Sequence, residues 1–167
     1  VGNRIYLTCY SGYAQSKQEP GKPEDLGRHV LCLARDSGKI LWQKDFEPKL
    51  PESAYSGGNN SHHGYATSTC TSDGERLYVF FGKSGVYALD LDDGEQVWHV
   101  TVGDKTKGWG SATSPFLFEN LLIVNASIES GRIVALDKKT GKVICRRKIG
   151  DYKAGYSYTA APIIVKG

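Results

Sequence analysis

The sequence contains no methionine and no long hydrophobic run. A membrane helix needs roughly 18 consecutive apolar residues, and no window of the chain approaches that length. The N-terminus also lacks the pattern of a signal peptide. We therefore expect no membrane insertion. Because the chain has no initiator methionine and opens at Val1 in what reads as a strand, we expect it to have been cut from a longer polypeptide.

The sequence has no long run of basic residues and no long run of acidic residues. The 21 basic residues are scattered among 18 acidic ones, and the net charge is only +3. A surface that follows phosphates needs its basic side chains in one stripe or patch. Nucleic acid is therefore not an expected partner.

Paired cysteines are also missing. Cys9, Cys32, Cys70 and Cys145 show neither the CxxC spacing of a zinc or redox site nor two adjacent thiols. We interpret them as small buried hydrophobic residues. Cys9 and Cys32 fall on strands that we expect to pair, so a disulfide between these two stays open.

The usual metal patterns fail too. An EF-hand loop beginning at Asp90 would need an acidic residue at its twelfth position, which is Thr101. His62 and His63 are adjacent, and neighbouring side chains of an extended strand point to opposite faces. We expect no metal site.

What the chain does have is glycine, tyrosine and a repeat. Three segments each read as an apolar strand, a polar turn closed by glycine, and a second apolar strand, with the glycines at Gly38, Gly94 and Gly141. These glycines are 56 and 47 residues apart, and an insertion at 47–62, rich in Pro, Ser, Gly and Asn, accounts for the longer interval. Four short strands in roughly 40 to 50 residues make one propeller blade.

The repeat predicts an all-β fold, a β-propeller of four-stranded antiparallel blades with about three blades present. We expect one partial domain over 1–167, with blades at about 3–46, 64–104 and 108–150 and the first strand of a next blade at 155–167. The small-residue segments 66–70, 111–115 and 158–162 are the expected innermost strands, because strands crowd together toward the axis.

The repeated A-x-D-x-x-T-G-x-x-x-W pattern resembles the tryptophan-docking motif of pyrroloquinoline-quinone-like (PQQ-like) propellers. The resemblance implies that Trp42 and Trp98 pack, largely buried, against neighbouring blades, and that the turns make the outer hairpins rigid. The residues that carry it are Gly38 and Trp42 in the first copy, Ala88, Asp90, Gly94 and Trp98 in the second, and Ala135, Asp137, Thr140 and Gly141 in the third. The third copy has Cys145 in place of tryptophan, and the first has Cys32 and Ala34 in place of Ala and Asp.

The resemblance implies two possible functions. The segments that flank the repeats look like bacterial propeller repeat proteins without assigned chemistry. This likeness favours a non-catalytic protein- or ligand-binding scaffold with no cofactor, in the periplasm or elsewhere outside the cytoplasm. The alternative is part of a quinoprotein alcohol dehydrogenase, which would use PQQ and calcium; the adjacent cysteines of many such enzymes are absent. No G-x-S-x-G motif of a hydrolase is present.

One group of aromatic residues is a candidate ligand site. Tyr65, Trp109 and Tyr156 follow glycines at equivalent points of the expected inner strands, with His63 and Tyr158 beside them. These side chains should ring one mouth of the central channel, where they either bind a small ligand or plug the channel. The long loop at 10–28 is a second candidate for recognition.

Three blades leave an open edge, since closed propellers have four to eight. Unpaired strand edges seek partners. We expect either missing blades of the parent protein to close the ring or two copies to form a homodimer. In the dimer the strand at 158–165 would pair with the strand at 4–9 of the other copy.

Overall fold

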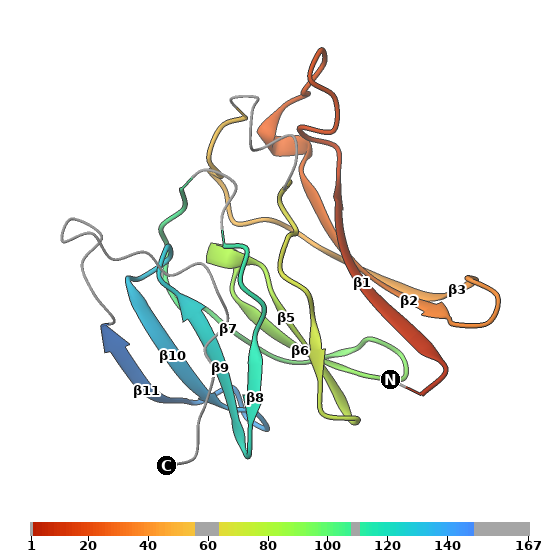
Figure 1. Cartoon of the computed structure of the whole chain (residues 1–167). Helices are drawn as coiled ribbons and strands as arrows, with labels where there is room; N and C mark the ends of the chain where they lie inside the picture. Colours follow the sequence, from red (N-terminus) through yellow and green to blue (C-terminus); the bar gives the residue numbers. More distant parts are fainter. Residues whose placement is uncertain (1, 56–63, 108–110, 149–167) are drawn as a thin grey trace.

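The computed structural model describes residues 2–55, 64–107 and 111–148. They form three antiparallel sheets, arranged side by side as a fan (Figure 1). The helices in the described part are two single 3₁₀ turns, η1 (Pro23–Asp25) and η2 (Gly82–Ser84). The fold is therefore all-β, as predicted, and no described helix is long and apolar enough to cross a membrane.

Each sheet is one blade, and its strands follow one another in chain order. Blade 1 contains β1 (Arg4–Ser11), β2 (Gly27–Ala34) and β3 (Ile40–Phe46). Blade 2 contains β4 (Thr71–Ser72), β5 (Arg76–Phe80), β6 (Val86–Asp90) and β7 (Gln96–Val100). Blade 3 contains β8 (Phe116–Phe118), β9 (Leu121–Ala126), β10 (Arg132–Asp137) and β11 (Val143–Lys148).

The innermost strands differ from the sequence prediction. We expected them at 66–70 and 111–115, but β4 and β8 begin after these segments. The two small-residue segments are instead linked by side chains: Ser68 Oγ donates to the Thr113 carbonyl over 3.0 Å, and the Ser114 hydroxyl accepts from the Thr69 N–H over 3.0 Å. These bonds join neighbouring blades and are not part of a strand ladder. The prediction of regular inner strands there was wrong. The third copy, at 158–162, lies outside the described residues.

The outer hairpins of the three blades share one turn. Gly38, Gly94 and Gly141 have φ of 68°, 74° and 72°, the left-handed conformation that glycine adopts without a steric penalty. Each donates its N–H to the carbonyl of the residue four positions earlier. In the second and third turns an aspartate oxygen, of Asp90 and of Asp137, also accepts backbone N–H groups inside the turn. The turn is thus set by local chemistry.

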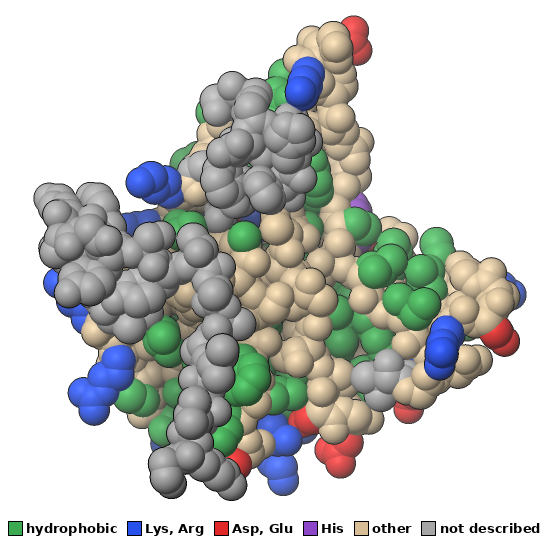
Figure 2. Space-filling model, in the orientation of Figure 1, with side chains coloured by type: hydrophobic (Ala, Val, Ile, Leu, Met, Phe, Trp, Pro, Cys, Tyr) green, Lys and Arg blue, Asp and Glu red, His purple; other side chains and the backbone are tan. Residues whose placement is uncertain are grey.

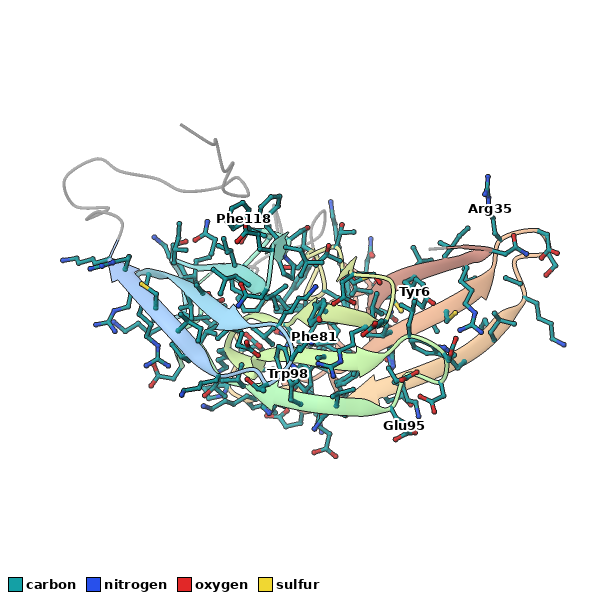
Figure 3. All side chains as sticks on the ribbon, turned by 90° about the horizontal axis from the view of Figure 1, so that it is seen from below. Tyr6, Arg35, Phe81, Glu95, Trp98 and Phe118 are labelled. Carbon is teal, nitrogen blue, oxygen red and sulfur yellow. The ribbon has the colours of Figure 1, made fainter. Side chains whose placement is uncertain are left out.

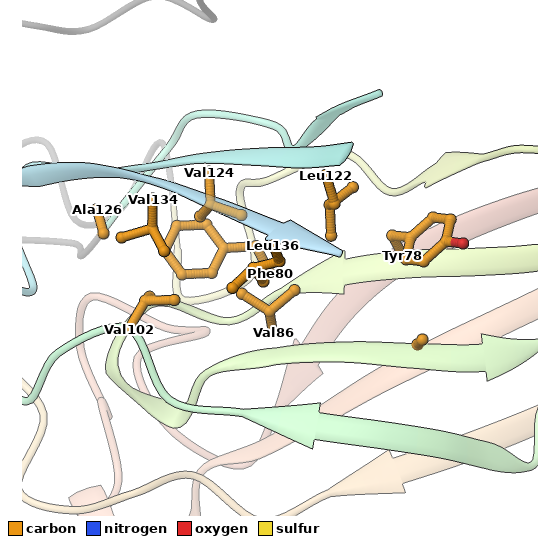
Figure 4. Close-up of a cluster of buried hydrophobic side chains, with 10 residues drawn as sticks. Tyr78, Phe80, Val86, Val102, Leu122, Val124, Ala126, Val134 and Leu136 are labelled. Carbon is orange, nitrogen blue, oxygen red and sulfur yellow. The ribbon is translucent and has the colours of Figure 1, made fainter. Parts of the chain in front are cut away.

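The hydrophobic core lies between blades rather than within one sheet. One cluster joins blades 2 and 3, and the apolar side chains of the two sheets interdigitate there (Figure 4). A second cluster joins blades 1 and 2 through residues such as Val30, Leu77 and Leu89. Alternate residues of β5 and β6 enter the two clusters, so both faces of blade 2 are buried.

The four cysteines are free thiols. Cys32 is fully buried opposite Tyr6, whereas Cys9 is opposite His29 further along the same strand pair. The disulfide that the sequence left open does not form. Burial raises the pKa of the Cys70 thiol to about 11, which keeps it protonated near neutral pH.

Candidate functional site

A tryptophan from one blade covers the turn glycine of the next blade. The Trp42 ring at the outer strand of blade 1 lies over Gly94, so that an added Cβ at this glycine would be 2.9 Å from the ring. The Trp98 ring of blade 2 lies over Gly141 in the same way, at 2.8 Å. Both tryptophans are half-buried rather than largely buried, because one edge of each outer strand faces solvent.

The same interfaces contain an arginine and a tyrosine that sequence analysis missed. Arg4 donates to the carbonyls of Leu91 and Asp92, at 3.0 and 3.2 Å, and the Tyr6 hydroxyl donates to the Leu91 carbonyl over 3.0 Å. Arg4 also forms an ion pair with the Asp92 carboxylate at 2.9 Å. Arginine, tyrosine and tryptophan thus bind one turn together.

Blade 2 repeats this arrangement on blade 3 with one difference, because among the described residues Trp42 Nε1 is buried without a hydrogen-bond partner whereas Trp98 Nε1 has one. The Lys138 carbonyl accepts from the Tyr78 hydroxyl over 3.2 Å and from Trp98 Nε1 over 3.1 Å, and Arg76 donates to the Lys139 carbonyl over 2.6 Å. We call each arginine, tyrosine and tryptophan set a donor set, and the turn that receives it an acceptor turn. Trp98 and Tyr6 mark the two donor sets in Figure 3.

A buried polar cluster joins all three blades at the end that carries η2. Arg28 of β2 is 4% exposed and uses its three nitrogens on three groups, the Tyr65 carbonyl, the Ser84 hydroxyl and the Glu52 carboxylate, at 2.7 to 2.9 Å. The other Glu52 oxygen accepts from Thr106 over 3.0 Å. A buried charge is tolerated only when it is paired and hydrogen-bonded. This arginine and this glutamate meet that condition.

Glu129 belongs to the same cluster and is 1% exposed. Both carboxylate oxygens accept from the Ser111 hydroxyl, at 2.7 and 2.9 Å. Burial raises the pKa of Glu129 to about 7, the nearby Glu52 charge adds to the rise, and the Ser111 hydrogen bond and Arg28 oppose it. The side chain therefore changes charge close to neutral pH.

The hollow enclosed by these groups is small. Its walls include Arg28, Glu52, Lys83 and Glu129, and its volume is about 10 Å³. That is about the space of one water molecule. The Lys83 ammonium donates to the Pro51 carbonyl instead of projecting into open solvent. Chemically, the cluster can hold a water molecule and a proton.

Of the predicted channel-mouth residues, the structure describes only Tyr65. Its ring is 4% exposed between Tyr10 and Tyr13, with ring centroids 5.8 and 5.5 Å away. Its hydroxyl donates to the Ser53 carbonyl over 2.8 Å. The ring thus packs against other aromatic rings. His63, Trp109, Tyr156 and Tyr158 lie outside the described residues, and the ligand site stays a prediction.

The candidate recognition loop at 10–28 is held against the blade by these rings. Tyr13 and Leu26 are 4% and 3% exposed, and the Tyr13 hydroxyl accepts from the Tyr55 N–H over 2.7 Å. Ala14 has φ of 57°, which is a strained value for a residue with a side chain. The outward side chains of this loop, among them Gln15 and Lys17, are exposed.

Ser11, His29 and Asp45 form a cross-strand chain on blade 1. Ser11 Oγ is 2.7 Å from His29 Nε2, and His29 Nδ1 is 2.7 Å from Asp45 Oδ1. Such an order of groups can draw a proton from a serine when the carboxylate is buried. Here the Asp45 side chain is 69% exposed and also accepts from Gln43 over 2.7 Å. These hydrogen bonds lower the pKa of Asp45, so it stays charged in solvent.

Repeated blades, shared turns and paired donor sets define the class of this protein, a propeller of the PQQ-like type. Residues 25–167 match the family described as outer membrane protein assembly factor BamB. The chain belongs to this PQQ-like propeller family.

Its curated relatives fall into two groups. The chain is 31% identical over 157 residues to quinoprotein alcohol dehydrogenase PedH of Pseudomonas putida, which covers 90% of the chain and 26% of the relative. It is 27% identical over 115 residues to BamB of Yersinia pestis, covering 68% of the chain and 26% of the relative. The chain thus spans about a quarter of these relatives.

Solved structures give the same fold. A europium-containing methanol dehydrogenase aligns over 87% of the chain and 23% of its own length, with a TM-score of 0.56 and 18% identity. BamB from Moraxella catarrhalis aligns over 75% of the chain and 34% of its own length, with a TM-score of 0.53 and 19% identity. Both likenesses concern architecture alone.

Proposed function

We propose that this chain is a non-catalytic part of a PQQ-like propeller and serves as a scaffold that binds a protein or a small ligand. The proposal rests on the observation that the buried charged side chains of Arg28 and Glu52 are fully hydrogen-bonded to protein groups. Arg28 spends its three nitrogens on protein acceptors, and Glu52 is bonded through both oxygens. Such a network holds three blades in a fixed relation and presents their loops rigidly.

The second candidate is part of a quinoprotein alcohol dehydrogenase. The relatives with that name favour it, since they include a quinoprotein ethanol dehydrogenase of Pseudomonas putida that is 32% identical over 120 residues. The pairing of the buried charges opposes it, because Arg28 and Glu52 are already bonded to protein groups. The sequence also contains no adjacent cysteine pair.

Quinone and calcium binding separates these two functions. The chain is titrated with PQQ and Ca²⁺ while absorbance and melting temperature are recorded, with a quinoprotein dehydrogenase as positive control. We expect no saturable absorbance change and no shift in melting temperature. Saturable binding accompanied by dye-linked alcohol oxidation would establish the dehydrogenase and overturn the scaffold.

Labelling of Ser11 tests a different enzymatic function. A fluorophosphonate probe reacts with serines whose proton is drawn away by a histidine. Because the Asp45 carboxylate is open to solvent, we expect no adduct on Ser11 by mass spectrometry. An adduct that disappears in His29→Gln would show an activated nucleophile and contradict the non-catalytic proposal.

We also propose a location outside the cytoplasm. The support is the family description, which names an outer membrane assembly factor. Nucleic acid is not a proposed partner, because the basic and acidic residues are interspersed.

A further inference from the structure

One end of blade 3 carries a group of basic side chains that the strand register brings together. Arg146, Arg147 and Lys148 are the last residues of β11, and Arg132 begins β10, where it pairs with Lys148. All four side chains are exposed. Lys and Arg side chains line the side of the molecule on which β11 lies (Figure 2). We call these four residues the basic edge.

The charges of the basic edge are not balanced by acidic side chains. No ion pair among the described residues involves any of its four members. Of the acidic residues of blade 3, Glu119 and Asp137 lie at the opposite end of the sheet, since both flank the pairing of Leu121 with its neighbouring strands. Glu129 is buried. The basic edge therefore presents four unpaired positive charges to solvent.

This arrangement costs stability in the free chain. Arg132 and Lys148 are directly opposite each other on neighbouring strands, and like charges in such a pair are destabilising. The matching pair of blade 1, three positions before Cys32 and three after Trp42, is His29 with Asp45. Its side chains attract instead, at 2.7 Å. A bound anion would remove the repulsion that blade 3 alone carries at this position.

The basic side chains lie on both faces of the strand. Arg146 shares a face with its partner Val134, which belongs to the core between blades 2 and 3, and Lys148 lies on the same face. Arg147, between them, points to the other face. A flat membrane surface would meet only one of these faces, and four charges form no stripe that a phosphate backbone could follow. A narrow chain running along the strand can meet both.

We propose that the basic edge binds an acidic segment of a protein partner through the carboxylates of that segment. The inference rests on the proposed scaffold function and gives its partner a chemistry. The guanidinium groups of Arg132, Arg146 and Arg147 match a carboxylate with two parallel hydrogen bonds. Positive charges on an edge strand also keep other strands from pairing with it. The segment would therefore be held by side chains and not as an added strand.

A second copy of this chain is a poor source of that segment. Its most acidic stretch is the turn of blade 2, where the Asp92 carboxylate is paired with Arg4 and the Glu95 carboxylate with Lys44. These carboxylates already hold blades 1 and 2 together. The acidic segment is accordingly expected on a different protein.

Binding of a fluorescent hexaglutamate peptide, followed by anisotropy at low salt, tests the proposal. We expect saturable binding that weakens as salt is added. In Arg146→Glu/Lys148→Glu the dissociation constant should rise at least about tenfold, because two attractions become repulsions. Arg35→Glu/Lys39→Glu, at the exposed turn of blade 1, makes the same change in net charge and should shift it by no more than about twofold. Far-UV circular dichroism checks that both variants fold.

The outcomes that overturn the proposal are distinct. Absence of hexaglutamate binding, or an equal loss in both variants, would show that the basic edge is no site. Tighter binding of phosphatidylglycerol vesicles or of oligothymidylate would assign a different partner, and self-association that Arg146→Glu/Lys148→Glu abolishes would assign a second copy. The PQQ and Ca²⁺ titration decides the scaffold function separately, so a chain that binds neither quinone nor peptide would lose this site but keep that function.

Discussion

At the scale of single residues, two kinds of side chain stabilise this chain. Trp42 and Trp98 use an aromatic face and act across a blade boundary. Arg28 and Glu129 use charge or a titrating group and act at the point where the three blades meet. A smaller side chain cannot take the place of either tryptophan, because it would leave the glycine beneath it uncovered. The second depends on its partners, since an unpaired buried charge is costly.

Trp98→Ala should destabilise the fold by about 2–4 kcal/mol, somewhat less than the largest core truncations because the ring is half-buried. The substitution removes the cover of Gly141 and the bond to the Lys138 carbonyl. Chemical denaturation measures the loss. The control Val97→Ala, at a 46% exposed neighbour, should change stability by no more than about 0.5 kcal/mol. Equal, small effects would show that Trp98 does not dock.

Glu129 makes stability depend on pH. Its pKa is about 7 in the folded chain and near 4.5 when the side chain is free in water. Between these values the folded state binds more protons than the unfolded state, so stability falls as pH rises from about 5 to about 8. By the size of the shift the fall is roughly 2–3 kcal/mol.

Glu129→Gln should remove this dependence, because the amide stays neutral. Urea denaturation at pH 5 and pH 8 measures the difference for both proteins. Asp36→Asn, at an exposed turn position, is the control and should leave the slope unchanged. A wild type that is more stable at pH 8 than at pH 5 would contradict the assignment of the raised pKa to Glu129.

At the scale of elements, the outer hairpin turn does two jobs. It reverses the chain, and it presents a carbonyl and a bare glycine to the neighbouring blade. The first job needs the left-handed φ that Gly38, Gly94 and Gly141 share. The second needs the missing side chain. The two requirements can be tested separately because, within the described residues, a tryptophan ring covers Gly94 and Gly141 but not Gly38.

Alanine at each turn glycine should separate them. Gly38→Ala should cost about 1–2 kcal/mol, the strain of the left-handed conformation alone. Gly94→Ala and Gly141→Ala should cost roughly 1–3 kcal/mol more, because the new methyl group meets the Trp42 or Trp98 ring. Denaturation midpoints of the three variants give the comparison. Equal losses at all three would mean that the rings yield without strain.

The sequence predicted the elements whose chemistry is local. The turns and the blade repeat were predicted because each turn is a short polar segment closed by glycine, and such a segment determines its conformation within a few residues. The inner strands were placed wrongly because Ser68 and Ser114 bond across blades, which no local pattern announces. The Arg28 cluster depends on residues far apart in sequence. The donor sets, by contrast, left a visible signal, Arg–x–Tyr at Arg4 and again at Arg76.

At the scale of the whole molecule, the blades form a linear series. Blade 2 packs against both of its neighbours, whereas blade 1 has one face uncovered in the described part. In such series each repeat is stabilised by its nearest neighbours. Blade 2 should therefore be the most stable part.

Amide hydrogen exchange tests this order. The central strands β2 and β6 are each hydrogen-bonded on both sides, so they are matched for strand pairing. We expect the amides of β6 to exchange roughly tenfold or more slowly than those of β2. Identical rates would show instead that the three blades open as one cooperative unit.

The donor set and the acceptor turn of blade 2 serve opposite neighbours: the turn at Gly94 receives Trp42, and Trp98 reaches onward to Gly141. A duplicated copy of blade 2 would place its own tryptophan over the turn of the next blade, and its own turn would receive the tryptophan of the blade before it. Insertion or deletion of such a unit therefore preserves every junction. In a closed propeller the number of such units is limited by ring closure.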